Sequence, residues 1–211
     1  MTFQMKQPRQ FSEDKLVIAT HNKGKLSEII SMFDKFDFSL ISANELRLPE
    51  PEETETSFKG NALLKARTAA NASGLPSLAD DSGLSVTALH GAPGIYSARW
   101  AMPNGNFEKA MRRVHKELSK IETHDFSAQF VCALALVWPN GDEVCVEGRV
   151  DGHIIWPPRG KFGFGYDAIF QPNGHELSFG EMAPEKKHNM SHRADAFNQL
   201  LHTVFKPLDV S

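Results

Sequence analysis

The chain lacks several features that mark secreted, membrane-spanning and zinc-binding proteins. Only two of its 211 residues are cysteines, Cys132 and Cys145, and neither belongs to a Cys-x-x-Cys pair. This argues against a disulfide framework and favours a reducing, cytoplasmic setting. No apolar run approaches the ~20 residues that span a bilayer. Because the polar segment 1–14 has no apolar centre, we expect a flexible N-terminal extension rather than a signal peptide, followed by a single domain over residues 15–211.

Common catalytic signatures are absent as well. The nine histidines form no His-x-His or His-Glu-x-x-His pattern, which argues against a zinc site. No Gly-x-Ser-x-Gly segment marks a serine hydrolase. The formal net charge of −3 argues against broad electrostatic binding to nucleic acid or to an anionic membrane. Basic residues that bind phosphate must therefore be concentrated locally.

Alternating strand and helix patterns indicate an α/β fold. Apolar residues recur at positions 26, 29, 30 and 33, which is the spacing of one helix face, and Gly74 ends a second helical pattern. In chain order the patterns predict a strand at 16–19, helices at 26–33 and 57–73, a strand at 84–88, a helix at 107–118, a hairpin of 126–138 with 143–150, a strand at 168–170 and a helix after 191. Because a long hairpin interrupts the alternation, we expect a mixed sheet.

The hairpin pattern also predicts how the two cysteines lie. Asn140-Gly141 between apolar runs is typical of a two-residue type I′ turn. Such a turn would place Cys132 opposite Arg149 and Cys145 opposite Leu136. The two sulfur atoms would then be roughly 13 Å apart along the ladder, which is too far for a disulfide.

A polar loop follows the first predicted strand. Residues Thr20 to Lys25 include two lysines, an asparagine and a glycine, and they precede a helix. Free backbone N–H groups and the helix dipole favour anions at such a position. The loop is not a P-loop, because Ala19 and Leu26 replace the glycine and the hydroxyl residue of that motif. Alone, it predicts either phosphate binding or a solvated loop.

Two acidic segments could hold a metal ion. Asp80-Asp81-Ser82-Gly83 predicts a tight turn with adjacent carboxylates, which could bind Mg²⁺ and provide a base for a water molecule. The alternative is an aspartate-rich turn that caps its own backbone. The acidic loop 49–55 could add another metal ligand or be plain solvated surface.

Two later segments suit a nucleoside. Phe162 to Asp167 alternates glycines, which allow close approach of the backbone, with aromatic rings that could stack on a base or face the core. Lys186, Lys187, His192 and Arg193 gather near the N-terminus of the last helix. Cations there oppose the helix dipole unless an anion or polar ligand is present.

Together these segments resemble the Ham1/inosine triphosphatase family of nucleotide pyrophosphatases. The matching stretches run in order over nearly the whole chain from residue 16 to about 205. They are 19–25 (ATHNKGK), Ser57-Phe58 with Asn61-Ala62 and 65–67 (KAR), 79–84 (ADDSGL), 91–99 (GAPGIYSAR), 164–167 (FGYD) and 191–193 (SHR). Any one of them is a weak signal, whereas all six in register are specific.

The resemblance implies a fold, an activity and an assembly. The implied fold is α/β, an elongated mixed β-sheet flanked by helices, with an active-site cleft between two lobes. The implied activity is Mg²⁺-dependent hydrolysis of non-standard purine nucleoside triphosphates, such as dITP, ITP and XTP, to the monophosphate and pyrophosphate. A homodimer is implied, and we expect no nucleic-acid or membrane partner.

The resemblance also implies roles for individual residues. Asp81 resembles the proton acceptor and a metal ligand, Glu52 resembles a second metal-site carboxylate, and Ser82 would touch the substrate. The implied triphosphate site is Thr20, His21, Asn22, Lys23, Gly24, Lys25 and Lys65, with Arg99 as a further phosphate contact. The implied base and sugar site is Phe164, Gly165, Tyr166, Asp167, Lys187, His192 and Arg193.

Three alternative functions are a Maf-type pyrophosphatase, a nucleotide sensor and an RNA-binding module. A Maf-type pyrophosphatase would act on modified or pyrimidine nucleotides, but the combination of 80–83 (DDSG) with 191–193 (SHR) favours the purine enzyme. A non-catalytic nucleotide sensor would bind dITP without releasing pyrophosphate. An RNA-binding module is disfavoured by the net negative charge and by the lack of an RNP or KH pattern.

Overall fold

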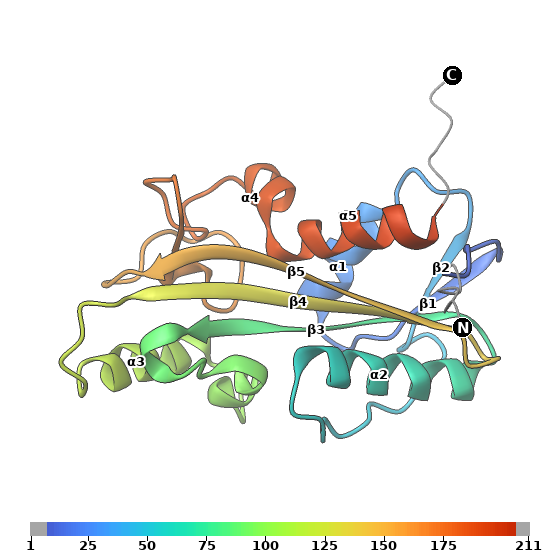
Figure 1. The fold of residues 1–211 in the computed structure, drawn as a ribbon, viewed down its shortest axis with the longest axis horizontal. Coiled ribbons are helices and arrows are strands. Elements are labelled where there is room, and N and C mark those ends of the chain that lie inside the picture. The colour runs from blue at the N-terminus through green and yellow to red at the C-terminus, as the bar shows by residue number, and fades with distance from the viewer. Residues whose placement is uncertain (1–7, 206–211) are drawn as a thin grey trace, which may run out of the picture.

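The computed structural model describes residues 8–205, which are built around one six-stranded sheet (Figure 1). Its strands are β1 (Lys15–Ile18), β2 (Ser39–Ser42), β3 (Ser77–Val86), β4 (Ser127–Val137), β5 (Glu143–Ile154) and β6 (Phe170–Pro172). They lie in the order β2-β1-β3-β4-β5-β6. Strand β1 is parallel to β2 and β3, and all other pairs are antiparallel. The predicted mixed sheet is confirmed.

Helices cover both faces of the sheet. They are α1 (Lys23–Met32), α2 (Phe58–Ser73), α3 (Phe107–Leu118), α4 (Pro184–Met190) and α5 (His192–Val204). Figure 1 shows α2 and α3 below the long strands β3, β4 and β5, with α4 and α5 above them. Helix α1 packs in the same core cluster as α5. The sheet is elongated because these three strands run along the length of the molecule.

Strand β4 separates the two helical layers through the alternation of its side chains. Cys132, Leu134 and Leu136 are buried in one core cluster with residues of α1 and α5. Ala133 and Ala135 are buried in another with the alanines of α2. Because the apolar run of β4 packs against helices on both sides, β4 is a central strand that is covered on both faces.

The far end of the long strands has a core of its own. Leu84 and Phe130 pack there with Val114 of α3 and with Ile169 and Phe179. We call this part, with α3 and β6, the second lobe, and the part with β1, β2, α1, α2 and α5 the first lobe. The functional side chains lie where the two lobes meet.

The N-terminal segment differs in part from the predicted flexible extension. The backbone N–H of Phe11 donates to the carbonyl of Val204 at 2.7 Å. Its ring lies 4.9 Å from that of Phe38 and 5.1 Å from that of Phe205, measured between centroids. Phe11 thus packs in the core of the first lobe, Arg9 stacks on Trp138 and Gln10 donates to the carbonyl of Thr203. Only positions 1–7 of the extension lie outside the described residues.

The hairpin has a different turn from the predicted one. Trp138 N–H donates to the carbonyl of Asp142, and Gly141 has φ of 89° whereas Asn140 does not have positive φ. The loop therefore has three residues, with glycine in the left-handed region, and is not type I′. The register shifts by one residue, so that Cys132 is opposite Gly148 and Ala135 is opposite Cys145. The predicted absence of a disulfide is confirmed.

Three further elements differ from the sequence prediction. The segment Asp80 to Gly83 lies inside β3 rather than in a turn. Residues Asp167–Ile169 form a 3-10 turn, so that the strand predicted at 168–170 begins at Phe170. Helix α4 was not predicted as a separate element, and Lys187 lies on it rather than at the start of the last helix.

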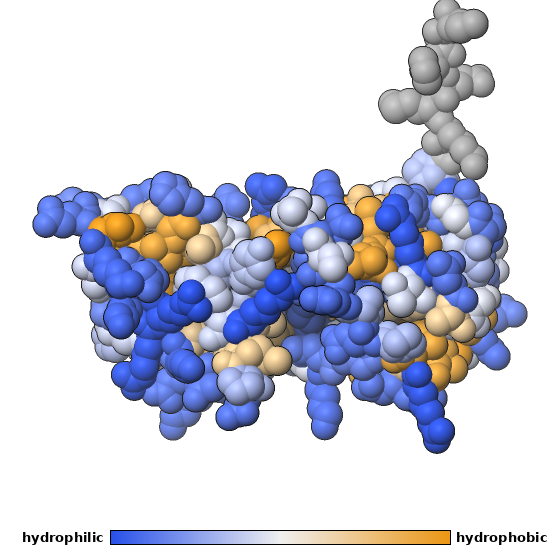
Figure 2. Space-filling model, turned by 90° about the horizontal axis from the view of Figure 1, so that it is seen from below, coloured by the Kyte–Doolittle hydropathy of each residue, from blue (hydrophilic) through white to orange (hydrophobic). Residues whose placement is uncertain are grey.

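The surface gives no sign of a membrane segment. Across residues 8–205, every helix is too short or too polar to cross a bilayer. Figure 2 shows the face that carries α2 and α3 as mostly hydrophilic, with its apolar residues in separate patches.

Candidate active site

The adjacent aspartates of β3 point to opposite faces of the sheet, because successive side chains of a strand alternate. Asp81 faces α2 and contacts Lys65 and Asn61. Asp80 faces the other layer and contacts Lys25 of α1 and Arg193 of α5. The idea that both carboxylates bind one metal ion from a turn is therefore wrong, and each aspartate has its own set of partners.

On the α2 side, one lysine joins two carboxylates. Lys65 Nζ lies 3.0 Å from Asp81 Oδ1 and 2.8 Å from Glu53 Oε1. Asn61 Nδ2 donates to Asp81 Oδ2 at 3.2 Å. Burial and the negative charge of Glu53 raise the pKa of Asp81 above its ordinary value, although Lys65 and Lys25 oppose this rise. A carboxylate with a raised pKa that faces a cleft is suited to accept a proton.

On the other side, Asp80 is the centre of a buried ion-pair network. Its Oδ2 lies 3.0 Å from Lys25 Nζ, 3.2 Å from Arg193 Nη2 and 3.1 Å from Ser82 Oγ. Burial alone would raise the pKa of Asp80, but Lys25, Arg193 and Lys65 outweigh burial and hold that pKa well below its usual range. Asp80 therefore stays ionised and orients the cations around it.

The loop before α1 has the geometry of an anion-binding helix start. Asn22 caps the helix, because its Oδ1 accepts from Lys25 N–H at 3.1 Å, and Thr20 Oγ1 accepts from Asn22 N–H at 3.3 Å. His21 Nε2 lies 3.3 Å from the carbonyl of Leu48. The loop thus brings Lys25 to the cleft and contacts the start of the acidic loop.

The glycine-rich segment builds the opposite end of the cleft. Asp167 is 3% exposed, and its Oδ2 accepts from Phe164 N–H at 2.8 Å and from Lys187 Nζ at 2.6 Å. Gly163 has φ of 72°, and a side chain there would collide with Asp167 Oδ2. Lys187 Nζ lies 5.0 Å from the centre of the Phe164 ring, which is 38% exposed. The Phe164 ring therefore offers an open face beside a buried cation.

Two residues at the start of α5 complete this end. Ser191 caps the helix by accepting from Ala194 N–H. His192 stacks on Phe130, with ring centroids 4.9 Å apart. Burial, together with Arg193 and Lys187, holds the pKa of His192 well below its usual value, so the ring is neutral at neutral pH. Within the described part of the chain, His192 Nδ1 and Arg193 Nε are buried without a hydrogen-bond partner, which suits a polar ligand.

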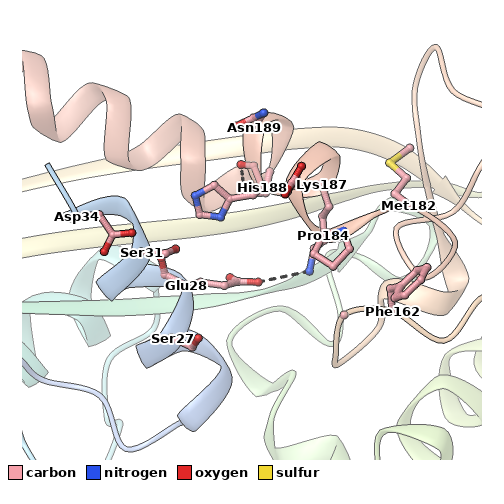
Figure 3. A pocket seen from close by; sticks show the side chains of 13 residues that line it. Ser27, Glu28, Ser31, Asp34, Phe162, Met182, Pro184, Lys187, His188 and Asn189 are labelled. Carbon is pink, nitrogen blue, oxygen red and sulfur yellow. Dashed lines mark hydrogen bonds and ion pairs between the residues drawn. The ribbon is translucent and has the colours of Figure 1, made fainter.

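A shallow groove adjoins this end of the cleft (Figure 3). It has a volume of about 690 Å³ and lies between α1, α4 and the glycine-rich segment. Figure 3 shows Glu28 of α1 reaching across to Lys187 of α4, and Glu28 Oε1 lies 3.6 Å from Lys187 Nζ. Glu28 also pairs with Arg193 Nη1. This carboxylate therefore separates the outer groove from the cleft.

Most of the predicted site residues come together. The cleft or its extension is lined by Thr20, His21, Asn22, Lys25, Lys65, Asp81, Ser82, Phe164 to Asp167, Lys187, His192 and Arg193. Gly24 lines neither, and Lys23 is exposed and lines a separate groove beside Ser27 and Ser31. Glu52 is exposed, and it is Glu53 that joins Lys65 and Asp81. Arg99 donates to the carbonyl of Glu53 rather than standing free for a phosphate.

Three residues that contribute to the site were not predicted individually from the sequence. Glu28 pairs with cations of the cleft, while Asn61 and Glu53 contact the Asp81 cluster. Asp80 was predicted only as a possible metal ligand and instead pairs with Lys25 and Arg193. One available signal was helical spacing: Glu28 follows Lys25 by three residues, so both lie on one face of α1. Asn61 and Lys65 are four residues apart, so they too share one face of their helix, α2.

The Asp81 cluster fits a hard divalent cation. Asp81 and Glu53 offer carboxylate oxygens next to each other, and Mg²⁺ prefers oxygen ligands. Within residues 8–205 no group of three or more His, Cys, Asp and Glu is placed to hold a metal ion. A Mg²⁺ ion held by one or two carboxylates takes its other ligands from water and substrate phosphates.

Comparison with known proteins identifies relatives of this chain. The model of the Ham1 family matches residues 16–203. The chain is 59% identical to the dITP/XTP pyrophosphatase of Caulobacter vibrioides, over 90% of this chain and 98% of that protein. It is 56% identical to the dITP/XTP pyrophosphatase of Rhodospirillum centenum, over 95% of this chain and 100% of that protein.

Solved structures show the same fold. A HAM1 protein from Coxiella burnetii superposes with a TM-score of 0.84 at 38% identity, covering 89% of this chain and 96% of that one. The nucleoside-triphosphatase, or dITP/XTP pyrophosphatase, of Mycobacterium abscessus gives a TM-score of 0.73 at 42% identity, covering 89% and 98%.

Proposed function

The chain belongs to the Ham1 family, and from this premise we propose that it hydrolyses non-standard purine nucleoside triphosphates, such as dITP, ITP and XTP. The products would be the nucleoside monophosphate and pyrophosphate, so that the enzyme would remove these nucleotides from the pool. The names of its relatives support the substrate class.

The observation that carries this proposal is a row of buried cations along one cleft. Lys65 and Lys25 lie at the end formed by the helix start, whereas Lys187 and Arg193 lie at the end with the exposed face of Phe164. Lys65, Lys187 and Arg193 are buried, the Lys25 side chain is 17% exposed, and each of the four is paired with a carboxylate. The first end suits a polyphosphate and the second suits a base, because an aromatic face can stack on a purine.

Hydrolysis between the α- and β-phosphates needs a positioned water and charge neutralisation on the leaving group. Asp81 would accept the proton of the water or orient it, since its pKa is raised and its second oxygen is held by Asn61. Lys25 and Lys65 would offset the charge that develops on pyrophosphate. Glu53 and Asp81 would hold Mg²⁺, which when bound supplies further neutralisation of the phosphate oxygens.

Selectivity would come from hydrogen bonding at the purine edge. Inosine and xanthine present a 6-oxo acceptor, which donors of Arg193 or His192 can meet. Adenine presents an amino group there, so that donor would face donor and a buried group would stay unpaired, at a cost of about 1–3 kcal/mol. The unpartnered Arg193 Nε is consistent with a donor that awaits a ligand.

A panel of nucleoside triphosphates assayed for pyrophosphate release with Mg²⁺ tests the proposal. We expect ITP, dITP and XTP to react far faster than ATP, GTP or pyrimidine nucleotides. A preference for pyrimidine or modified nucleotides would favour the Maf-type alternative, and tight binding of dITP without release would favour a sensor. In ¹⁸O-labelled water the label should enter the monophosphate, and label in pyrophosphate would mean attack at the β-phosphorus.

Assembly and location remain part of the proposal. We propose a cytoplasmic homodimer, in line with the resemblance to the Ham1/inosine triphosphatase family. Sedimentation velocity at micromolar concentration checks the assembly, and a monomer under those conditions would contradict it.

A further inference from the structure

Arg99 of the second lobe contacts residues 49–57 of the first lobe, a segment that contains the acidic loop 49–55. It begins the 3-10 turn Arg99–Ala101, which lies between β3 and α3. Its Nη2 donates to the backbone carbonyl of Glu53 at 2.7 Å and lies 3.5 Å from the carboxylate of the same residue. We propose that Arg99 is a positioning residue, which acts on catalysis by fixing Glu53 rather than by binding substrate phosphate.

The acidic loop needs such contacts because it has no regular structure of its own. Three other side chains hold it, and all of them come from the first lobe. His21 Nδ1 lies 3.8 Å from the Glu50 carboxylate, Lys65 binds the Glu53 carboxylate, and Asn61 Oδ1 accepts from the N–H of Glu55 at 3.1 Å. Arg99 supplies a contact between the loop and the second lobe.

The geometry at Glu53 assigns separate roles to its two cationic partners. Lys65 binds the carboxylate and also contacts Asp81, so it sets the distance between the two acids. Arg99 binds the carbonyl, so it sets the position of the main chain that carries the side chain. The guanidinium carbon of Arg99 lies over the Tyr96 ring, 5.0 Å from its centre, and this cation–π contact stabilises the position of Arg99. Fixing both ends of Glu53 keeps its carboxylate against the Asp81 cluster.

A double-mutant cycle separates this role from direct substrate contact. This test rests on the proposed function, because it uses kcat/KM for ITP. Arg99→Gln should lower kcat/KM about tenfold in the wild-type background and less than about twofold in a Glu53→Gln background, since two residues that act through one contact are not additive. Arg99→Lys should restore part of the loss, because an ammonium can still donate to a carbonyl. Arg112→Gln, which breaks an exposed ion pair on α3, is the matched control and should change nothing.

A second measurement does not depend on activity. Amide hydrogen exchange of the peptide that spans residues 49–57 should become faster in Arg99→Gln and stay unchanged in Arg112→Gln. The proposal is overturned by equal losses from Arg99→Gln in both backgrounds, or by unchanged exchange of the loop. A raised KM with unchanged kcat and additive losses would make Arg99 a phosphate contact. If wild-type protein releases no pyrophosphate, the proposed function fails, and the exchange measurement still decides the role of Arg99.

Discussion

At the scale of single residues, the adjacent Asp80 and Asp81 have different roles because they lie on opposite faces of β3. Asp81 faces the cleft, accepts hydrogen bonds from Lys65 and Asn61, and has a raised pKa. Asp80 is 1% exposed and holds Lys25 and Arg193, and its pKa is lowered. We therefore expect substitution of Asp81 to affect chemistry and substitution of Asp80 to affect stability.

Asp81→Asn should abolish turnover while leaving a folded protein. The amide keeps the shape of the side chain but cannot accept a proton or bind Mg²⁺ strongly, so kcat should fall roughly 10²-fold or more at saturating Mg²⁺. Initial rates of pyrophosphate release measure this, and circular dichroism checks the fold. A loss of less than about tenfold would remove Asp81 from its assigned role.

Asp80→Asn should destabilise the fold by about 3–5 kcal/mol, because it removes one partner of a buried ion-pair network. The folded-state pKa of Asp80 is depressed, so its contribution is complete above the unfolded-state pKa of about 3.9 and is lost as pH falls below that value. Urea unfolding should therefore show the same difference between wild type and variant at pH 7 and pH 5, and a smaller one near pH 3.5. A difference that grows as pH falls would contradict this account.

Arg193→Lys should reduce selectivity for the base more than it reduces binding of phosphate. Lysine keeps the charge near Asp80 and Glu28 but lacks a donor equivalent to Nε, the Arg193 nitrogen that has no hydrogen-bond partner. We expect kcat/KM for ITP to fall by about 2 kcal/mol, near thirtyfold, while the low value for ATP changes little. Arg149→Lys, at an exposed ion pair on β5, is the control. Equal losses for both substrates would make Arg193 a phosphate ligand or a structural residue.

Residue-level prediction from the sequence worked where a motif fixed the register. Asp81, Lys65 and Lys187 all lie in the cleft as expected from their motifs. Glu52 stays a prediction as a metal ligand, while the structure places Glu53 rather than Glu52 against Lys65. An irregular loop has no periodicity, and nothing in its closely spaced acids and prolines shows which side chain turns inward. The ion pairs of Glu28 join α1 to residues more than 150 positions later, and no local pattern predicts such contacts.

At the scale of elements, the position of α5 decides where His192 and Arg193 lie. Gly148 of β5 allows the close approach of this helix. A methyl group at that position would lie 2.2 Å from the backbone nitrogen of Ala196 and 2.3 Å from the carbonyl oxygen of His192. Both atoms belong to the helix backbone, so only a shift of α5 could relieve the collision.

Gly148→Ala should therefore destabilise the protein by about 1–3 kcal/mol, as overpacking does, and should lower kcat/KM for ITP by moving α5. Urea unfolding and pyrophosphate release measure the two effects. The neighbouring substitution Arg149→Ala, on an exposed side chain of the same strand, should have little effect on either. Wild-type stability and activity in Gly148→Ala would show that the contact with α5 is not needed.

Element boundaries were predicted well where end signals exist. Helix α2 begins after Ser57, whose side chain caps Gly60 N–H, and ends at Gly74 in the left-handed region. The sequence predicted a turn at residues 80–83, in the middle of β3, because Asp, Ser and Gly favour turns. Its pairing with β4 through ten residues overrides that preference, and Gly83 is needed there because a side chain would meet Ser97 Oγ at 2.4 Å.

At the scale of the whole molecule, residues from both lobes line the cleft, and one continuous sheet runs through both lobes. Tyr166 of the second lobe donates to the carbonyl of Ser97, and Arg99 contacts the acidic loop of the first lobe. Strands β3, β4 and β5 run through both lobes. The lobes therefore share backbone hydrogen bonds as well as a site, and residues 15–205 should unfold as one unit.

Nucleotide binding should stabilise this unit as a whole. ITP with Mg²⁺, bound to Asp81→Asn so that it is not consumed, should add about 2.7 kcal/mol of stability at a concentration one hundred times Kd. For a chain of this size each kcal/mol raises Tm by about 2–4 °C, so a single calorimetric transition should move up by roughly 5–10 °C. ATP at the same concentration should shift it less, which makes it the matched control. Two transitions of which only one moves would mean that the lobes unfold independently, and the single-domain assignment would then be wrong.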